Sequence, residues 1–496
     1  MPISRESLQP RPAVWALAAT AAAVGAGVLY ESSLGINWFL WIASASVAVL
    51  AARYVHQRRV ERPLLILLGW AGVLALSTSI TTADNIHVLT IASDAMLLGL
   101  AIVVIGAERW RSLSVGVLPT VPFLAPLRVW SASLTATIAI PARLSALRSR
   151  PVARGIIISL PIALVLLALL KDADPVIGWV WARVTDLLPA WSVSGRVVLF
   201  FVLLSLTLGA VSLAATLAEP RVPVIRTLSR RELGFTEQRM VLATVAAVLW
   251  LFVVLQLGYF VHPPPSVLDS GVTFADYARR GFAEISLAVT LAGAILIVLE
   301  ATRPKDLTDS RNIQLTRLKA ALIVALEVAL VLAFRRVILY EGAYGFTTAR
   351  VYAQAYMFAV AVGLGALWLE VRAGRVSVNL GRRLAIIGLG TLTVIAFWNH
   401  QSWILNKNID RARETGKIDT RYLATLSQDV VPTLVARRGE LPAADRSVAE
   451  QWSVCTLPKE KARWFEYNVR LNAAQNAVKA AALQCTNPDF RKELRS

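Results

Sequence analysis

Long apolar runs separated by short polar or basic loops make up the chain as far as residue 403. A helix needs about 20 predominantly apolar residues to cross roughly 30 Å of hydrocarbon. About eleven segments meet this requirement: residues 13–30, 36–53, 63–80, 86–106, 155–171, 195–218, 239–261, 281–301, 318–338, 348–370 and 384–403. They lack the two-residue alternation that is typical of half-buried strands. The pattern therefore predicts an all-α fold, a polytopic transmembrane helix bundle within residues 1–403.

One apolar stretch, residues 113–142, does not fit a spanning helix. It contains Arg128 and four prolines: Pro119, Pro122, Pro126 and Pro141. A span there would also invert every later loop and place the basic clusters outside. We therefore interpret residues 107–154 as an interfacial or re-entrant segment on the cytoplasmic side.

Basic residues gather in alternate loops, whereas the loops at 31–37 and 81–86 carry no Lys or Arg. The basic loops contain Arg53, Arg58, Arg59, Arg62, Arg221, Arg226, Arg230, Arg231, Arg303, Lys305, Arg311, Arg317, Arg372, Arg375, Arg382 and Arg383. Loops rich in Lys and Arg stay in the cytoplasm. The bias predicts a multi-pass protein of the inner cell membrane, with its amino terminus inside and its carboxyl terminus outside.

The composition agrees with a membrane protein and argues against nucleic-acid binding. The 496 residues are 56% hydrophobic and 17% charged, whereas soluble domains contain about 25% charged residues. The net charge of +19 lies mostly in the short loops. We therefore expect the lipid bilayer as partner and no binding of nucleic acid.

Residues 404–496 are polar and charged, with helical patterning. Asp419 and Ser427 are of the residue types that cap helices. We expect a small extracytoplasmic helical domain that contacts an exported protein partner. Both cysteines of the protein, Cys455 and Cys485, lie here, and outside the cytoplasm disulfides persist. We expect one bridge between them.

The soluble catalytic signatures are missing from the sequence. It contains no G-x-x-x-x-G-K-[ST], no G-x-S-x-G and no H-E-x-x-H motif. Its four histidines have no metal-ligand spacing. We therefore expect no metal, no cofactor and no enzymatic activity.

Polar residues within or next to the spans are the remaining candidates, because ionisable groups at depth are costly. Glu327 lies near the middle of residues 318–338, and its candidate partners are Gln256 and Gln354. It is either a functional residue or a hydrogen-bonded packing residue.

The outer membrane boundary carries a further group. Tyr277, Arg280 and Glu284 recur at helical spacing. Glu341, Arg350 and Gln354 lie in LYEGAYGFTTARVYAQAY (339–356). In this segment we expect a turn at Gly345, followed by a helix that Thr347 or Thr348 caps. Two hypotheses stay open: an ion-pair cluster that fixes helix ends, or an outward-facing ligand pocket.

Several short motifs carry a resemblance. The motifs are ELGFTEQRMVLATV with LQLGYF (232–260), TFADYARRGFAEI (273–285), residues 339–356, KDADPVI (171–177) and NIDRARETGKIDTRYLATLSQDVVPTLV (408–435). They resemble the bacterial polytopic membrane proteins of domain-of-unknown-function families 4153 and 4173. The similarity extends over residues 150–435. The matching positions are Glu237, Gln256, Tyr277, Arg280, Gly281, Glu284, Tyr344, Gly345, Thr347, Arg350, Asp419 and Tyr422. The resemblance implies an integral membrane protein without an assigned activity.

Three functions follow from these observations. The first is a non-enzymatic sensor or scaffold with an exported C-terminal domain. The second is a secondary transporter or flippase that uses Glu327 and the outer polar residues. The third and weakest is a lipid-modifying enzyme with Glu284 or Asp276 as base.

Overall fold

The computed structural model describes most of the chain as helices joined by turns, with no β-strand among the described residues. The described ranges are residues 12–105, 121–138, 191–217, 233–261, 274–304, 307–373, 379–458 and 462–486, together with Val176, Trp179 and Arg183. The predicted fold class, an all-α helix bundle, is confirmed.

Eight of the described helices are long and apolar enough to cross a membrane. They are α1 (Pro12–Leu29), α2 (Ile36–Val55), α3 (Arg62–Leu76, extended by the 3-10 turn η2, Ser77–Ser79), α4 (Asp84–Val104), α9 (Trp191–Thr216), α10 (Phe235–Val261), α14 (Thr348–Arg372) and α15 (Asn379–Phe397). They correspond to eight of the predicted segments, and they make the chain a multi-pass membrane protein.

The other three predicted spans have different outcomes. Residues 155–171 lie outside the described part of the chain. Residues 281–301 fall in α12 (Phe274–Ala301), whose apolar part is the shorter Ile285–Glu300. Residues 318–338 fall in the 36-residue α13 (Asp309–Tyr344), which carries charged side chains along its length. The number of eleven spans stays a prediction.

The end of the last span differs from the expected residue 403. Helix α15 ends at Phe397, and a new helix, α16 (His400–Thr415), begins three residues later. The Asn399 side chain accepts a hydrogen bond from the backbone N–H of Ser402 at 3.3 Å and so caps α16. A polar cap at this point separates the apolar helix from the polar one.

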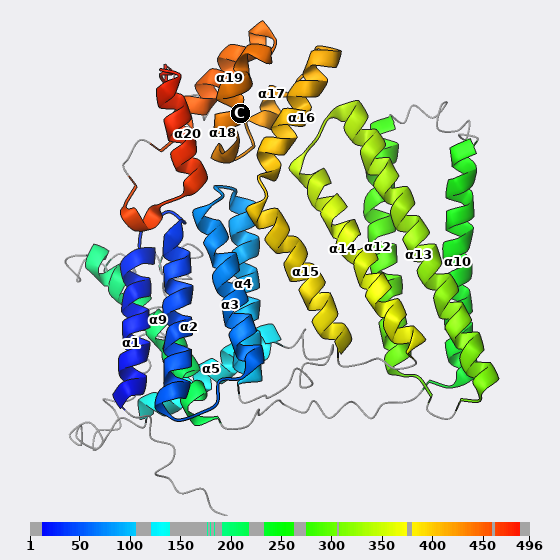
Figure 1. Ribbon diagram of the computed structural model, residues 1–496, viewed down its shortest axis with the longest axis horizontal. Helices are drawn as coiled ribbons and strands as arrows, with labels where there is room; N and C mark the ends of the chain where they lie inside the picture. The colour runs from blue at the N-terminus through cyan, green and yellow to red at the C-terminus, as the bar shows by residue number, and fades with distance from the viewer. Residues whose placement is uncertain are drawn as a thin grey trace, which may run out of the picture.

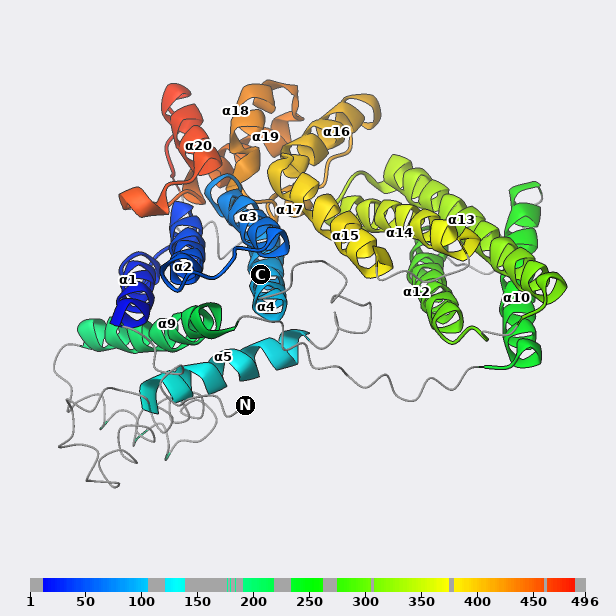
Figure 2. The same ribbon diagram turned by 60° about the horizontal axis from the view of Figure 1, so that its bottom comes forward.

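The long helices form two bundles with separate cores (Figure 1 and Figure 2). The first bundle contains α1 to α4, α9 and α5 (Val121–Ile138), and the second contains α10 and α12 to α15. Within the first bundle, a Cβ on Gly209 would lie 2.0 Å from the carbonyl oxygen of Val129. Glycine therefore allows α9 and α5 to pack backbone to backbone.

Helix α5 is the described part of the segment at 107–154 that we interpreted as interfacial. It contains Pro126 and lies crosswise at the end of the first bundle, packed against α4 and α9 (Figure 1 and Figure 2). Its depth in a membrane stays a prediction.

The two bundles meet mainly through α15. The indole N–H of Trp70 in α3 donates to the hydroxyl of Thr393 in α15 at 3.1 Å. Leu389 and Leu392 of α15 also pack against the core of the first bundle. A single helix thus belongs to one bundle and contacts the other.

Ion pairs with buried acidic side chains join consecutive helices at the end of the bundles that carries the basic residues. Arg53 of α2 pairs with Glu61 just before α3, and Lys319 of α13 pairs with Glu300 of α12. Arg383 of α15 pairs with Glu370 of α14 at 2.9 Å. Each pair neutralises an acidic side chain that is at least 95% buried, which compensates part of its desolvation.

Residues 400–486, here called the C-terminal unit, form short helices around a core of their own. After α16 come α17 (Thr420–Leu423), α18 (Val431–Arg437), α19 (Ala443–Cys455) and α20 (Val469–Ala480), with 3-10 turns η6 (Gln428–Val430), η7 (Arg438–Glu440) and η8 (Trp464–Glu466) between them. Asp419 caps α17 and Ser427 caps η6, as their residue types predicted. Leu405, Leu434 and Trp452 contribute to the core.

A disulfide joins Cys455 at the end of α19 to Cys485 beyond α20, the two cysteines that the sequence pairs. The bridge closes a loop of 30 residues and ties the last helix to the core of the C-terminal unit.

Replacing both cysteines by serine should lower the free energy of unfolding of the C-terminal unit by about 3 kcal/mol, because the unfolded chain regains the entropy of a loop of this length. Thermal unfolding of the purified protein with limited proteolysis measures the loss, and alkylation of the denatured, unreduced protein counts thiols. Two alkylated thiols in the wild-type protein would contradict the disulfide.

Candidate functional site

The C-terminal unit sits on the ends of both bundles, opposite the ion pairs with buried acidic side chains (Figure 1). It contacts the loops between α1 and α2, between α3 and α4, and between α13 and α14. The first two are the loops without Lys or Arg. We call this contact region the joint.

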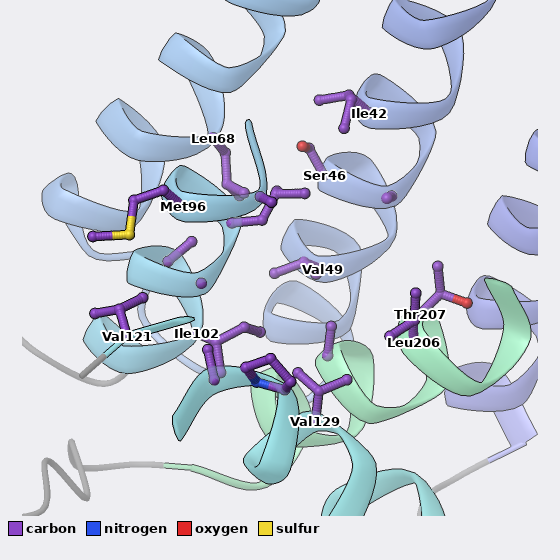
Figure 3. Close-up of a pocket in the computed structure, with 18 of the residues that line it drawn as sticks. Ile42, Ser46, Val49, Leu68, Met96, Ile102, Val121, Val129, Leu206 and Thr207 are labelled. Atoms are coloured by element: carbon purple, nitrogen blue, oxygen red, sulfur yellow. The ribbon is translucent and has the colours of Figure 1, made fainter. Parts of the chain in front are cut away.

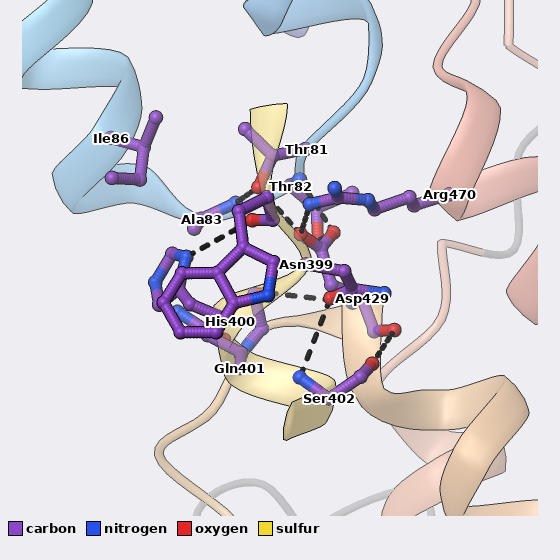
Figure 4. Close-up of polar contacts among 12 residues, drawn as sticks. Thr81, Thr82, Ala83, Ile86, Asn399, His400, Gln401, Ser402, Asp429 and Arg470 are labelled. Atoms are coloured by element: carbon purple, nitrogen blue, oxygen red, sulfur yellow. Dashed lines mark hydrogen bonds and ion pairs between the residues drawn. The ribbon is translucent and has the colours of Figure 1, made fainter. Parts of the chain in front are cut away.

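Asp429, in η6, is the centre of the joint (Figure 4). Its Oδ1 accepts from the backbone N–H and the hydroxyl of Thr82, both at 2.7 Å. Its Oδ2 accepts from the hydroxyl of Thr81 at 2.5 Å and from the Arg470 guanidinium at 2.9 Å. The residue is 2% exposed. Every oxygen of the carboxylate is therefore engaged, and the negative charge is compensated within the protein.

Arg470, in the first turn of α20, connects three parts of the chain. Besides its ion pair with Asp429, it donates to the carbonyl oxygen of Phe397 at the end of α15 at 2.8 Å. Its backbone N–H donates to the carbonyl of Ile80 at 3.3 Å. One residue thus binds the C-terminal unit to a helix of the second bundle and to a loop of the first.

Asn468 and the residues before it dock on the first bundle. The Asn468 amide donates to the carbonyls of Thr78 at 2.9 Å and Thr81 at 2.8 Å, while its oxygen caps α20. The N–H of Ile36, at the start of α2, donates to the carbonyl of Tyr467 at 3.2 Å. These bonds satisfy backbone groups at the ends of α2 and α3 that have no partner within their helices.

A second polar chain links α4, α14 and α16. The Asn85 amide donates to the hydroxyl of Tyr352 at 2.7 Å, and this hydroxyl lies 2.9 Å from Nε2 of His400. Nδ1 of His400 faces the carbonyl of Trp398 at 3.3 Å. The pattern fits a neutral imidazole that carries its proton on Nδ1 and accepts from Tyr352. Burial lowers the pKa of His400, and hydrogen bonding to Trp398 and the charge of Asp429 oppose this shift only in part.

The turn between α13 and α14 is held by the C-terminal unit. Gly345 has a φ of 83°, as its predicted role in a turn requires, and a Cβ there would lie 2.6 Å from Oδ1 of Asn408. The Asn408 amide bonds both the N–H and the carbonyl of Phe346, each at 2.8 Å.

The capping of α14 differs from what we predicted. Thr347 is at the N-cap position, but its side chain makes no capping hydrogen bond. The hydroxyl of Tyr422 instead accepts from the N–H of Thr348 at 2.8 Å. A side chain of the C-terminal unit, distant in sequence, replaces the local cap.

The predicted candidate residues are only partly brought together. Glu341 and Gln354 bond each other at 2.8 Å. Arg350 donates to the carbonyl of Gly345 and lies 4.1 Å from the centre of the Tyr340 ring. This part of the expected outer cluster is a contact between α13 and α14.

The other candidates lie elsewhere. Gln256 of α10 bonds Arg336 of α13 rather than Glu327, which lies half-buried along α13. Tyr277, Arg280 and Glu284 lie in the first turns of α12, and their side chains are outside the described residues. The convergence of Glu284 with Arg350 therefore stays a prediction.

The joint contains residues that the sequence analysis did not select: Thr81, Thr82, Asp429, Asn468 and Arg470. The signal for Asp429 was present, since it lies in SQDVVPTLV within the last family motif. The two threonines are common loop residues, and nothing local pairs them with Asp429, which lies 348 residues after Thr81.

Asp429→Ala should destabilise the joint by about 3–5 kcal/mol, because it leaves the buried Arg470 charge without its partner. Asp410→Ala is the matched control: Asp410 also pairs with an arginine, Arg437 at 2.7 Å, but its side chain is 51% exposed, so we expect a loss below about 1 kcal/mol. Thermal unfolding and protease cleavage between residues 400 and 486 measure both. Equal losses in the two variants would contradict a central role for Asp429.

Acidification should weaken the same region through His400. The folded protein disfavours the charged imidazole, whereas the unfolded chain takes up the proton near pH 6.5, so the free energy of unfolding falls as pH drops below about 6.5. Thermal unfolding of the wild type and of His400→Gln between about pH 8 and pH 5.5 measures the slope. The wild type should lose more stability than the variant, and parallel slopes would contradict the prediction.

Comparison with known proteins adds the family. The family model described as "Domain of unknown function (DUF4153)" matches residues 68–436, well over half of the chain. The match includes Thr81, Thr82, residues 339–356 and Asp429, and it ends before Arg470. No curated protein and no solved structure matches the chain. Of the two families that the motifs resemble, the chain therefore belongs to DUF4153, a family of unknown function.

Proposed function

We propose that this protein is a non-enzymatic sensor or scaffold of the inner membrane, which holds its C-terminal unit outside the cytoplasm for a protein partner. The joint is the observation that carries the proposal. Asp429 and Arg470 fix the unit to the first bundle and to the end of α15, while Asn408 and Tyr422 fix it to the turn before α14. A unit held at several points is presented in one orientation, which reduces the entropy cost of binding a partner.

The charge distribution supports the proposed orientation. The C-terminal unit lies at the end of the bundles where the loops at 31–37 and 81–86 lack Lys and Arg, whereas the last turns of α2 and α14, which carry Arg53 and Arg372, lie at the opposite end. Loops rich in Lys and Arg stay in the cytoplasm, and this supports an outer position for the unit.

The saturation of Asp429 supports a structural rather than a catalytic role. Four hydrogen bonds occupy its two oxygens, and the carboxylate is buried. A general base needs a lone pair within reach of a substrate proton. We therefore propose that Asp429 holds the C-terminal unit on the bundles and takes no part in catalysis.

A transporter or flippase is the second proposal, and two observations favour it. The bundles have separate cores and meet mainly through α15, an arrangement that lets one bundle move against the other. Oε1 of Glu341 is buried without a hydrogen-bond partner, so this carboxylate is available for a proton or a ligand.

Complementation of a deletion strain distinguishes the two proposals. The scaffold predicts that Glu327→Gln and Glu341→Gln restore the lipid and metabolite profile of the wild type, whereas substitutions on the outer face of α20, at the exposed Asn476 and Lys479, do not. A transporter predicts the reverse. Immunoblots of membranes confirm equal expression of all variants.

A photo-reactive amino acid at Asn476 tests the partner directly. The scaffold predicts one discrete adduct in living cells that is lost with Lys479→Glu. The same amino acid at Val331, a 67% exposed position of α13 within the predicted span 318–338, serves as control and should give no such adduct. Identical adducts from both positions would contradict a partner specific to the C-terminal unit.

A further inference from the structure

The first bundle contains a partly open cavity of about 420 Å³ between α2, α3, α4, α5 and α9 (Figure 3). Along α2 its wall extends from Trp38 to Val49, a length of roughly 16 Å at 1.5 Å per residue. The cavity is therefore elongated along the bundle, and its volume is within the range of ligand sites.

The wall changes in polarity along its length. Near α5 it consists of apolar side chains such as Ile102, Ile105 and Val129. Toward the start of α2, the end that faces the joint, it contains the indoles of Trp38 and Trp41, and the hydroxyl of Ser46 lies between these indoles and Val49. Such a gradient matches a molecule with a hydrocarbon chain and a polar end.

Two polar groups of the wall have partners in the protein. The indole N–H of Trp38 donates to Oδ2 of the fully buried Asp94 at 2.8 Å, which fixes the ring at the cavity wall. The hydroxyl of Thr207 donates to the carbonyl of Leu203 one turn earlier at 2.8 Å. These groups shape the cavity without offering a hydrogen bond to a ligand.

A third has none. Oγ of Ser46 is buried and makes no hydrogen bond. Nε1 of Trp41 also makes none, but this edge of the indole lies against Gly25 of α1, outside the cavity wall. Hydroxyls in the helices of this protein commonly bond the carbonyl one turn earlier, as Thr207 and Thr393 do, but Ser46 does not. Its residue is only 9% exposed, and Figure 3 shows its oxygen directed from α2 toward Leu68. A buried donor without a partner costs about 1–3 kcal/mol, which a ligand oxygen would recover.

We propose that this cavity binds the hydrocarbon chain of an amphipathic lipid, one of whose ester or hydroxyl oxygens bonds Ser46. The chain lies along α2 and ends near α5, and the polar end lies on the side of the joint. The same chemistry belongs to the acyl chain of a phospholipid and to an isoprenoid alcohol. This site is independent of the partner surface proposed above.

Photo-crosslinking of the full-length protein in membranes tests the site. One arm uses phosphatidylethanolamine with a diazirine in its acyl chain, and the other uses a diazirine-bearing polyprenol, with the labelled peptides identified by mass spectrometry. We expect labelling on the cavity faces of α2, α4 and α5. The arm that labels these faces identifies the source of the chain.

Val49→Phe fills the cavity, and Val47→Phe is its matched control, since Val47 is 62% exposed on the same helix and is not part of the wall. Ala95→Phe fills the cavity from α4 at a position that is not buried, so it tests the site even where Val49→Phe disturbs folding. Both filling variants should abolish cavity labelling and Val47→Phe should retain it. Ser46→Ala should weaken labelling roughly tenfold at limiting probe.

The proposal is overturned if neither probe labels the cavity faces, or if labelling is equal in the wild type, Val47→Phe, Ala95→Phe and Val49→Phe. Either result would mean that the probes report only lipid around the outside of the bundle.

Discussion

The ion pair between Asp429 and Arg470 is the interaction on which the arrangement of the molecule depends. Taking two charges out of water costs several kcal/mol each, and their attraction repays this only when further hydrogen bonds complete both groups. Here Thr81, Thr82 and the carbonyl of Phe397 provide them. These donors and this acceptor come from the end of one bundle and from the last helix of the other, while the ion pair itself belongs to the C-terminal unit. All hydrogen bonds of the pair therefore form only when the two bundles and the C-terminal unit are assembled. The pair thus stabilises the assembled arrangement of all three parts.

The two ends of the bundles solve the same physical problem by different means. Helix ends expose backbone groups without partners, and charged side chains near them must be neutralised or hydrated. At the end with the basic loops, pairs such as Arg53 with Glu61 join consecutive helices across a short loop. At the other end the loops contain few charges, and amide and hydroxyl groups of the C-terminal unit, such as those of Asn468 and Tyr422, bond the helix ends instead. Replacing local caps by a folded unit explains why this end of the bundles depends on residues far along the chain.

The sequence predicted the helices well because the signal for a membrane helix is local: about 20 apolar residues identify it without reference to any other segment. The caps at Asp419 and Ser427 were also predicted, since a cap acts within one turn. The candidate site was predicted less well. The rule that ionisable groups at depth are functional selected Glu327, whereas the polar network with four hydrogen bonds to one buried carboxylate centres on Asp429 at the boundary. Its neutral partners Thr81 and Thr82 give no signal in a single sequence, because their role exists only once distant segments meet.

The joint and the cavity share one helix, and this connects the two proposals physically. Helix α2 starts at Ile36, whose N–H is bonded by the C-terminal unit, and two residues later Trp38 lines the cavity. Trp38 in turn is held by Asp94 of α4, a helix that begins just beyond the threonines bound to Asp429. A lipid chain that moves α2 relative to α4 thus changes the spacing of the loops that the C-terminal unit must bridge. Such coupling is reciprocal in free energy: if an occupied cavity stabilises the joint, a partner that stabilises the joint must raise the affinity of the cavity by the same factor.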